Sequence, residues 1–251
     1  MHTLTFFGII PARYASTRFP GKPLAEINGK SMIRHVYERS NVALNHVIVA
    51  TDDLRIYDEV LGFGGKVVMT SDKHKSGTER CAEALSIVEN QENIKYDVVI
   101  NIQGDEPFLN PEHIRLLKSC FEDDSTEIAT IINPVHDADV LSNPDRVKVV
   151  VDTKGYALYF SRSAIPYVRN SKPGRWHLNH KYYQHIGIYA YRSDTLREIV
   201  HRGVSVLEKA ELLEQLRWLE NGYRIKTALT EYESFCIDTP EDLQRAVKKG
   251  I

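Results

Sequence analysis

Three cationic side chains lie close together near the start of the chain. Arg13, Arg18 and Lys22 fall within ten residues and are separated by glycine, proline and small residues. Guanidinium groups and a lysine ammonium suit the oxygens of a triphosphate. The segment follows a short apolar run at residues 6–11, and α/β proteins bind ligands at the carboxyl ends of strands. The pattern therefore indicates a triphosphate site, with a solvated basic loop as the alternative.

Two aspartates follow apolar runs much later in the chain. Asp105 comes shortly after the run at 98–102, within the sequence QGDEP, and Asp238 follows the run at 235–237. Magnesium in enzymes that act on nucleotides is held by one or two carboxylates together with substrate phosphates. We expect Asp105 and Asp238 to be ligands of Mg²⁺. Taken alone, each would more often be a helix cap or a turn residue.

Two familiar nucleotide motifs are missing. The glycines at 62, 64 and 65 have the wrong spacing for the dinucleotide fingerprint GxGxxG, and they precede a strand instead of following one. Gly29-Lys30-Ser31 imitates the end of a phosphate-binding P-loop, but Leu24 stands where that motif requires glycine. Asn28-Gly29 is instead typical of a tight hairpin turn. These patterns argue against a dinucleotide-dependent dehydrogenase.

Apolar runs of strand length alternate with segments of helical period along the first half of the chain. Strands are expected at 6–11, 47–51, 66–70 and 98–103, and helices at 31–44, 53–61, 77–88 and 111–121. Runs as apolar as 47–50 are typical of parallel strands that are covered on both faces. The expected fold class is α/β, with a Rossmann-like, mostly parallel sheet flanked by helices.

The rhythm changes after about residue 124. Strands expected at 147–152 and 156–161 flank a glycine-containing turn, which indicates an antiparallel hairpin. A strand at 182–191, a long helix at 207–222, a strand at 223–229 and a last helix that starts at Thr239 and Pro240 complete the chain. We expect a single domain over residues 1–251 with a smaller antiparallel region in its second half.

Composition limits the class of protein further. The 42% hydrophobic and 26% charged fractions are ordinary for a globular protein, and a net charge of −2 attracts neither nucleic acid nor anionic membranes. Cys81, Cys120 and Cys236 are widely spaced and odd in number, which suggests neither disulfides nor a cysteine zinc site. The apolar run at 4–10 is far shorter than the roughly 20 residues that span a bilayer. We expect a cytoplasmic protein with no nucleic-acid or membrane partner.

Six segments together resemble one enzyme family. They read IIPARYASTRFPGKPL at 9–24, QGDEP at 103–107, YALYFSR at 156–162, HIGIYAY at 185–191, LEQLR at 213–217 and DTPED at 238–242. In this order they are similar to the CMP-Kdo synthetases, the 3-deoxy-manno-octulosonate cytidylyltransferases. The resemblance implies the fold of a nucleotide-diphospho-sugar transferase. It also implies transfer of CMP from CTP to the anomeric hydroxyl of Kdo, giving CMP-Kdo and pyrophosphate for lipopolysaccharide assembly.

The resemblance assigns roles to the basic loop and to both aspartates. Matching the family's signature loop places Arg13, Arg18 and Lys22 on the phosphates of CTP, where they act catalytically by stabilising charge. Asp105 and Asp238 match the magnesium ligands of the family, and Asp105 is counted with the catalytic residues. The chemistry then requires no side-chain general base.

A second nucleotide contact is expected at residues 76–80, which read SGTER. The segment resembles the part of the family that lies near the nucleotide, so Ser76 and Gly77 are expected to bind CTP. Ser76 is also a plausible helix N-cap with Glu79 completing a capping box. Both interpretations can hold, because the N-terminus of a helix can face an anion.

The sugar acid is expected to meet a different set of residues. By the same resemblance these are Gln103, Arg162, His185, Tyr189, Glu214 and Gln215, which suit one carboxylate and several hydroxyls. His185 and Tyr189 also lie on one face of a strand and could be partly buried structural residues. Glu214 could form a surface pair with Arg217. Gln184 departs from the basic residue that some members carry, which puts the fine sugar specificity in doubt.

The resemblance also divides the chain by function and implies a homodimer. Residues 1–124 would mainly bind CTP, residues 125–229 would bind the sugar and form the dimer, and residues 230–251 would return to the core with a metal ligand. One alternative is a cytidylyltransferase for another acid sugar, such as 8-amino-Kdo or a sialic acid. Another is a catalytically silent nucleotide-binding protein, although binding alone would not require both aspartates together with Lys22.

Overall fold

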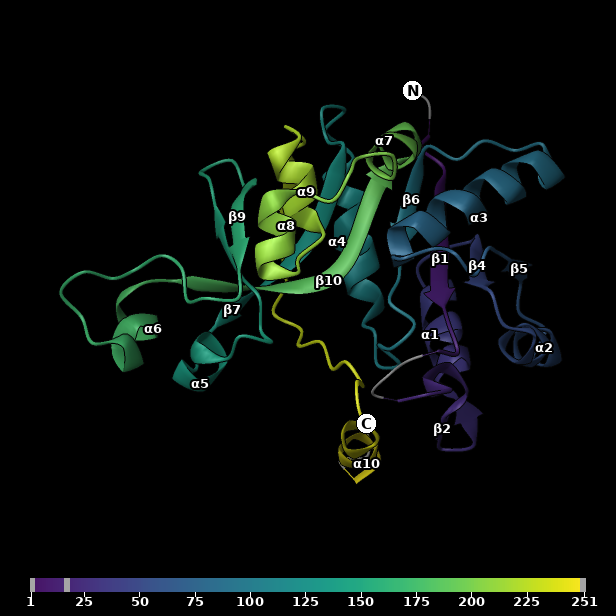
Figure 1. Cartoon of the computed structure of the whole chain (residues 1–251), viewed down its shortest axis with the longest axis horizontal. Helices are drawn as coiled ribbons and strands as arrows, with labels where there is room; N and C mark the ends of the chain where they lie inside the picture. Colours follow the sequence, from purple (N-terminus) through teal and green to yellow (C-terminus); the bar gives the residue numbers. More distant parts are fainter. Residues whose placement is uncertain (1–2, 16–18, 249–251) are drawn as a thin grey trace. The chain divides into compact units, whose positions relative to one another are not determined.

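The structure is a computed structural model, and it describes residues 3–15 and 19–248. The chain forms two compact units, and Figure 1 follows it from end to end. The first unit contains Met1–Arg115, Ala190–Val200 and Ser234–Ile251, and the second contains Leu116–Tyr189 and His201–Glu233. Both units are therefore assembled from segments that are far apart in the sequence.

A parallel sheet forms the centre of the first unit. Its strands β1 (Phe6–Ala12), β4 (Val47–Thr51), β5 (Val67–Met69) and β6 (Val98–Asn101) are arranged in the order β6-β1-β4-β5. Ile9 of β1 lies opposite Ile48 on one side and Asn101 on the other. All five residues of β4 are buried, as the apolar run predicts. Because β1 and β6 are parallel neighbours, the loops that follow them start at the same edge of the sheet.

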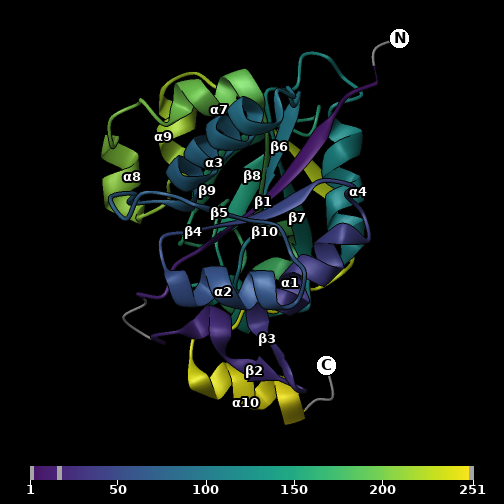
Figure 2. The ribbon, with the colours of Figure 1, turned by 90° about the vertical axis from the view of Figure 1, so that its right-hand side faces the viewer.

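Helices cover both faces of this sheet (Figure 2). The helices α1 (Met32–Asn41) and α2 (Leu54–Gly62) pack on one face, and α3 (Gly77–Glu92) packs on the other. The crossovers through α1 and α2 run from β1 outward to β5, whereas the crossover through α3 returns to the far side of β1. Right-handed crossovers in opposite directions place their helices on opposite faces. The helix α7 (Ser193–Ile199) packs beside α3.

The C-terminal segment packs against a small hairpin of the first unit. After the 3₁₀ helix η1 (Lys22–Leu24), β2 (Glu26–Ile27) and β3 (Lys30–Ser31) are joined by a turn with φ of 50° and 78° at Asn28 and Gly29. This confirms the predicted hairpin turn. Ile27 and Met32 form a buried cluster with Ile237 and with Ala246 of α10 (Pro240–Lys248), which lies beside the hairpin in Figure 2.

The second unit contains both parallel and antiparallel strands. β7 (Ile128–Val135) and β11 (Ile225–Leu229) pair in parallel, while β8 (Lys148–Val151) pairs antiparallel with β9 (Ala157–Ser161) and with β10 (Tyr182–Arg192). The last residues of β10 belong to the first unit. The hairpin between β8 and β9 turns through Gly155 at φ 78°, as predicted. The helical elements with residues here are α4 (Pro111–Cys120), α5 (Ala138–Ser142), η2 (Pro173–Arg175), α6 (Trp176–Asn179), α8 (Val206–Glu211) and α9 (Gln215–Glu220).

The prediction of one long helix at 207–222 is wrong. The structure has α8 and α9 instead, separated at Leu212, whose φ of 53° is left-handed. The Nε of Arg162 donates to the carbonyl of Glu211 at 2.7 Å, which satisfies an acceptor that the end of α8 leaves free. Leu213 and Leu216 are both buried, so apolar periodicity continues across the break. The apolar pattern therefore does not mark the break, whereas the hydrogen bond from the distant Arg162 lies at the place where the helix is interrupted.

The other predicted elements are confirmed with ends shifted by a few residues. The strand expected at 47–51 spans Val47–Thr51, whereas α3 continues to Glu92, beyond the expected end at residue 88. The α/β class with a mostly parallel, helix-flanked sheet is confirmed. Across the described residues, every helix is too short or too polar to cross a membrane.

Replacing Leu212 by glycine is expected to stabilise the protein. A left-handed backbone costs a leucine about 1 kcal/mol relative to glycine, and the Leu212 side chain is 78% exposed, so little burial is lost. Leu212→Gly should raise the free energy of unfolding in urea by about 0.5–1 kcal/mol. The same exchange at Leu178, 65% exposed within α6, should lower it, because glycine there only adds backbone freedom. A lower free energy of unfolding for both variants would contradict the strain argument.

Candidate active site

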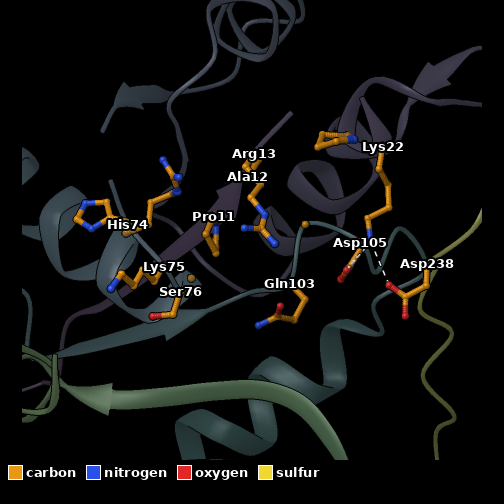
Figure 3. Close-up of a pocket in the computed structure, with 14 residues that line it drawn as sticks. Pro11, Ala12, Arg13, Lys22, His74, Lys75, Ser76, Gln103, Asp105 and Asp238 are labelled. Carbon is orange, nitrogen blue, oxygen red and sulfur yellow. Dashed lines mark hydrogen bonds and ion pairs between the residues drawn. The ribbon is translucent and has the colours of Figure 1, made fainter. Parts of the chain in front are cut away.

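A pocket opens in the first unit where β1 and β6 end. Its volume is about 260 Å³. The lining comes from the end of β1 and the residue after it, from the start of η1, from the beginning of α3 and the segment before it, and from the segment after β6 (Figure 3). Asp238, which precedes α10, also lines it. The predicted site residues that line it are Arg13, Lys22, Ser76, Gly77, Gln103, Asp105 and Asp238. Arg18 lies outside the described residues.

Lys22 joins the two predicted metal ligands at one end of the pocket. Its Nζ donates to Asp105 Oδ2 at 2.8 Å and to Asp238 Oδ1 at 3.3 Å (Figure 3). The side chain of Lys22 is 13% exposed, whereas those of Asp105 and Asp238 are 27% and 37% exposed, so the ammonium is better shielded from water than its partners are. Burial by itself lowers the pKa of Lys22, but the neighbouring acidic groups, Asp105 foremost, together outweigh it, and the pKa is raised. The ammonium is therefore charged at neutral pH.

Backbone contacts bring these three side chains together. Gly21 has a left-handed φ of 72°, which glycine adopts without strain, and it turns the chain into η1 immediately before Lys22. The backbone N–H of Ile237 donates to the carbonyl of Asp105 at 3.0 Å. This bond connects the segment after β6 to the segment before α10, so Asp238 arrives beside Asp105.

The acidic end of the pocket offers ligands for a divalent cation. One ligand atom each from Asp105, Cys236 and Asp238 lies within 4.8 Å of the others. Carboxylate oxygens are the ligands that Mg²⁺ prefers, whereas thiolates suit softer metals. Burial, reinforced by the two carboxylates, raises the pKa of the Cys236 thiol, which leaves the sulfur neutral. The donor set therefore fits Mg²⁺ through the two aspartates. Cys236 was not predicted, because a lone cysteine carries no spacing signal.

The N-terminus of α3 forms another part of the wall. Ser76 Oγ accepts from the N–H of Glu79 at 3.2 Å, which confirms Ser76 as the N-cap. The expected capping box is wrong, because the Glu79 carboxylate accepts from the N–H of Lys75 at 2.8 Å, one residue before the cap. Since α3 has 16 residues, its first turn carries partial positive charge beside Gly77. Anionic groups are therefore favoured at this wall.

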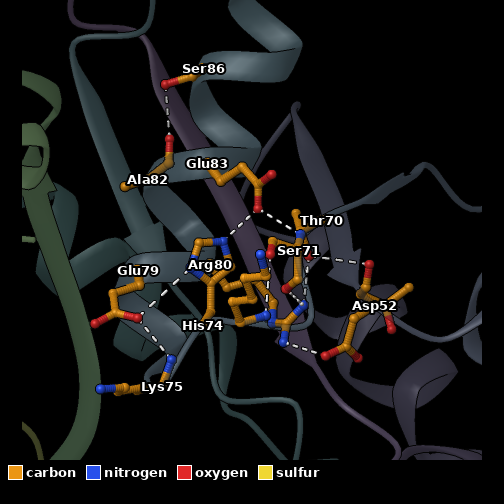
Figure 4. A network of polar contacts seen from close by, with 12 residues as sticks. Asp52, Thr70, Ser71, His74, Lys75, Glu79, Arg80, Ala82, Glu83 and Ser86 are labelled. Carbon is orange, nitrogen blue, oxygen red and sulfur yellow. Dashed lines mark hydrogen bonds and ion pairs between the residues drawn. The ribbon is translucent and has the colours of Figure 1, made fainter.

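A polar network around the buried Arg80 holds the segment that leads into α3 (Figure 4). Arg80 is 4% exposed, and its guanidinium donates to Asp52 Oδ2 at 2.7 Å and to Thr70 Oγ1 at 2.6 Å. Glu83 pairs with Nε2 of His74 on the same segment. The buried guanidinium of Arg80 thus has a carboxylate partner and a hydroxyl partner, which stabilises this part of the wall.

Three ionisable residues that line the pocket were not predicted as site residues from the sequence. They are His74, Lys75 and Arg80. The sequence near the start of a helix does not reveal whether a charged residue there is solvated or buried. A charged side chain is buried only where a partner of opposite charge is present, and that partner can lie elsewhere in the sequence. The partner of Arg80 is Asp52, which lies directly after β4.

Two of the sugar candidates lie together on β10 in the second unit. The rings of His185 and Tyr189 have centroids 5.2 Å apart, and Tyr189 packs edge-on against Trp218 at 5.0 Å. Nε2 of His185 shares a hydrogen bond of 2.9 Å with Thr130 Oγ1. The His185 side chain is partly accessible, yet burial among protein groups lowers its pKa to about 3. The imidazole is therefore neutral at physiological pH.

The other candidates of the second unit lie around α8 and α9. The guanidinium of Arg162 donates to three backbone carbonyls, those of Glu211 at 2.7 Å, Pro144 at 3.1 Å and Leu212 at 3.5 Å. Glu214 is the N-cap residue of α9, and Gln215, 5% exposed, is its first residue. The structure thus gives Arg162 a role in anchoring the end of α8. A role for these residues in sugar binding stays a prediction.

Comparisons with known proteins agree on one family. The family model described as "Cytidylyltransferase" matches residues 7–227. The 3-deoxy-manno-octulosonate cytidylyltransferase of Parabacteroides distasonis is 55% identical and covers 97% of this chain and 97% of its own length. The protein of the same name from Bacteroides thetaiotaomicron is 53% identical, with 97% of each chain covered.

Solved structures are similar over the same extent. A structure described as CMP:2-keto-3-deoxy-manno-octonic acid synthetase complexed with CTP is 40% identical, with a TM-score of 0.89 and 98% of both chains covered. A cytidylyltransferase from Leptospira borgpetersenii, 16% identical with a TM-score of 0.58 over 99% of this chain and 95% of its own, shares the fold alone. The chain belongs to the cytidylyltransferase family, alongside full-length relatives named 3-deoxy-manno-octulosonate cytidylyltransferase.

Proposed function

We propose that the protein is a 3-deoxy-manno-octulosonate cytidylyltransferase, which transfers CMP from CTP to Kdo and releases pyrophosphate. The observation that carries the proposal is the ammonium of Lys22 between Asp105 and Asp238, in a pocket that Arg13 and the start of α3 also line. One cavity thus combines cations for a triphosphate with carboxylates for a metal ion. The names of the full-length relatives support the choice of both substrates.

The cationic residues would act by neutralising charge. In the reaction the anomeric oxygen of Kdo bonds to the α-phosphorus, the bond from that phosphorus to the bridging oxygen of pyrophosphate breaks, and the hydroxyl proton is released. Negative charge grows on the departing pyrophosphate, so cations held in place lower the barrier. We assign this role to Arg13 and Lys22. Arg18, which lies outside the described residues, is proposed to share it.

We propose Mg²⁺ as the cofactor, with Asp105 and Asp238 as its protein ligands. When bound, such an ion neutralises phosphate oxygens and lowers the pKa of a coordinated hydroxyl. The backbone of Asp238 is held for this purpose, because its N–H and that of Thr239 donate to the Asp242 carboxylate at 3.0 and 2.9 Å. Asp105 is held through its carbonyl by Ile237.

For the sugar acid we propose the six residues that the family resemblance indicates. They are Gln103, Arg162, His185, Tyr189, Glu214 and Gln215. A neutral imidazole at His185 can donate or accept a hydrogen bond to a sugar hydroxyl without adding charge. We also propose that residues 1–124 mainly bind CTP, and that residues 125–229 bind the sugar and form a homodimer. The free cysteines favour a cytoplasmic location for the reaction.

Substrate turnover tests the proposal directly. Purified protein supplied with CTP, Kdo and magnesium should release pyrophosphate, measured with a coupled phosphate assay. Replacing CTP by UTP or ATP, or Kdo by 8-amino-Kdo or a sialic acid, should give slower release. Faster release with another acid sugar would reassign the substrate. Binding of CTP without turnover of any sugar acid would leave a silent nucleotide-binding protein and would contradict the proposal.

Removing one carboxylate at the acidic end of the pocket should nearly abolish catalysis. Asp105→Asn keeps the shape of the side chain but loses the charge, so kcat should fall about 100-fold or more. The same exchange at Asp194, whose side chain is 93% exposed, should leave kcat unchanged and controls for loss of a carboxylate. Steady-state kinetics at saturating CTP would decide, and wild-type kcat in Asp105→Asn would refute the metal assignment.

Acidification should destabilise the protein through His185. Its pKa is about 3 in the folded chain and about 6.5 when unfolded, so the unfolded state binds the extra proton as pH falls below about 6.5. Between pH 6 and 4 this residue should remove up to about 1.4 kcal/mol of unfolding free energy per pH unit. His185→Asn should show a smaller slope in urea unfolding, while His201→Asn controls for loss of an exposed imidazole. An unchanged slope in His185→Asn would show that the imidazole is charged when folded.

A further inference from the structure

The ammonium of Lys22 occupies the space between the two proposed metal ligands. Its Nζ lies 2.8 Å from one carboxylate oxygen of Asp105 and 3.3 Å from one of Asp238. Asp105 and Asp238 would hold a magnesium ion through their carboxylate oxygens. A metal ion and an ammonium group bound to the same oxygens would be close neighbours, so their positive charges would repel each other. A divalent cation that binds through these two oxygens can therefore enter only after Lys22 has moved away.

Moving Lys22 is unfavourable while the pocket contains no other anion. Among the described residues that line the pocket, Asp105 and Asp238 are the acidic ones, whereas Arg13, Lys75 and Arg80 are basic. The Lys22 side chain is 13% exposed, so its ammonium would lose both partners without regaining full hydration. Breaking a shielded ion pair by removing one partner leaves an uncompensated charge.

A triphosphate supplies the partner that Lys22 would otherwise lack. The lysine stem has four methylene groups and can redirect its ammonium toward phosphate oxygens elsewhere in the pocket. Replacing the ammonium by a divalent cation then becomes favourable at the acidic end. Two carboxylates with one ammonium have a net charge of −1, whereas two carboxylates with a divalent cation are neutral. The nucleotide thus provides the conditions under which both aspartates become available.

We propose that Lys22 keeps the metal site closed in the nucleotide-free protein and opens it when a nucleoside triphosphate takes the ammonium. The inference rests on the proposed function, which supplies the triphosphate and the divalent cation. Binding of nucleotide and of metal is then positively coupled, and by linkage each raises the affinity for the other. A free divalent cation binds weakly to the protein by itself.

Binding of Mn²⁺ without nucleotide tests this closure. Free Mn²⁺ is followed by electron paramagnetic resonance as protein is added. Lys22→Met removes the ammonium and keeps an apolar stem, so it should bind Mn²⁺ about tenfold or more tightly than the wild type. Lys30→Met makes the same charge change at a 41% exposed lysine paired with Glu38, and it should match the wild type. Equal Mn²⁺ affinity of Lys22→Met and the wild type would overturn the proposal.

A second measurement does not depend on the folding of Lys22→Met. In an otherwise wild-type chain, Asp238→Asn should leave Mn²⁺ binding unchanged without nucleotide, because the site is closed in both proteins. With CTP present, the same variant should bind Mn²⁺ more weakly than the wild type. Tight Mn²⁺ binding by the nucleotide-free wild type that Asp238→Asn removes would show an open site and would overturn the proposal.

The outcomes separate this inference from the proposed function. If the Mn²⁺ pattern holds but no sugar acid is turned over with CTP, closure by Lys22 stands and cytidylyl transfer fails. If CTP and Kdo are turned over but Lys22→Met gains no Mn²⁺ affinity, the enzymatic proposal stands and closure fails.

Discussion

The ammonium of Lys22 is held by carboxylates that are 83 and 216 residues away in the sequence. A shielded lysine is stable only beside such counter-charges, so three distant segments must meet at one point. Parallel pairing of β1 with β6 brings the first two segments to the same edge of the sheet. Packing of the C-terminal part against the β2–β3 hairpin brings the third. The sheet order and the late return of the chain both serve this contact.

The pocket is built with opposite charges in separate places. Carboxylates lie around Lys22 at one end, while Arg13, Lys75 and the start of α3 line other parts of the wall. Arg80 is itself neutralised by Asp52, so it positions the segment before α3 and adds little free charge. A cavity organised in this way can accept a triphosphate and its counter-ion together, because each meets groups of opposite sign.

The second unit satisfies its polar groups in a different manner. Arg162 donates hydrogen bonds to backbone carbonyls at the end of α8. His185 is neutral and lies among Thr130, Phe160 and Tyr189. Neutral donors and acceptors suit the hydroxyls of a sugar, since they form hydrogen bonds with little cost of desolvating charge. Recognition of the sugar carboxylate would require Arg162 to bind it with donors beyond those that anchor α8.

The sequence by itself determined the α/β class, the strand at Val47–Thr51, the turn at Asn28-Gly29 and the candidate phosphate and metal residues. Each depends on local information, namely an apolar run, a pair of residues suited to positive φ, or motifs of a known family. The tertiary structure alone decided that the helix at 207–222 is interrupted and that Cys236 lies beside both aspartates. It also decided that Lys22 stands between those aspartates. These features depend on contacts with residues that are distant in the chain. The spacing of apolar residues and the type of a single residue do not specify which distant residue it will contact.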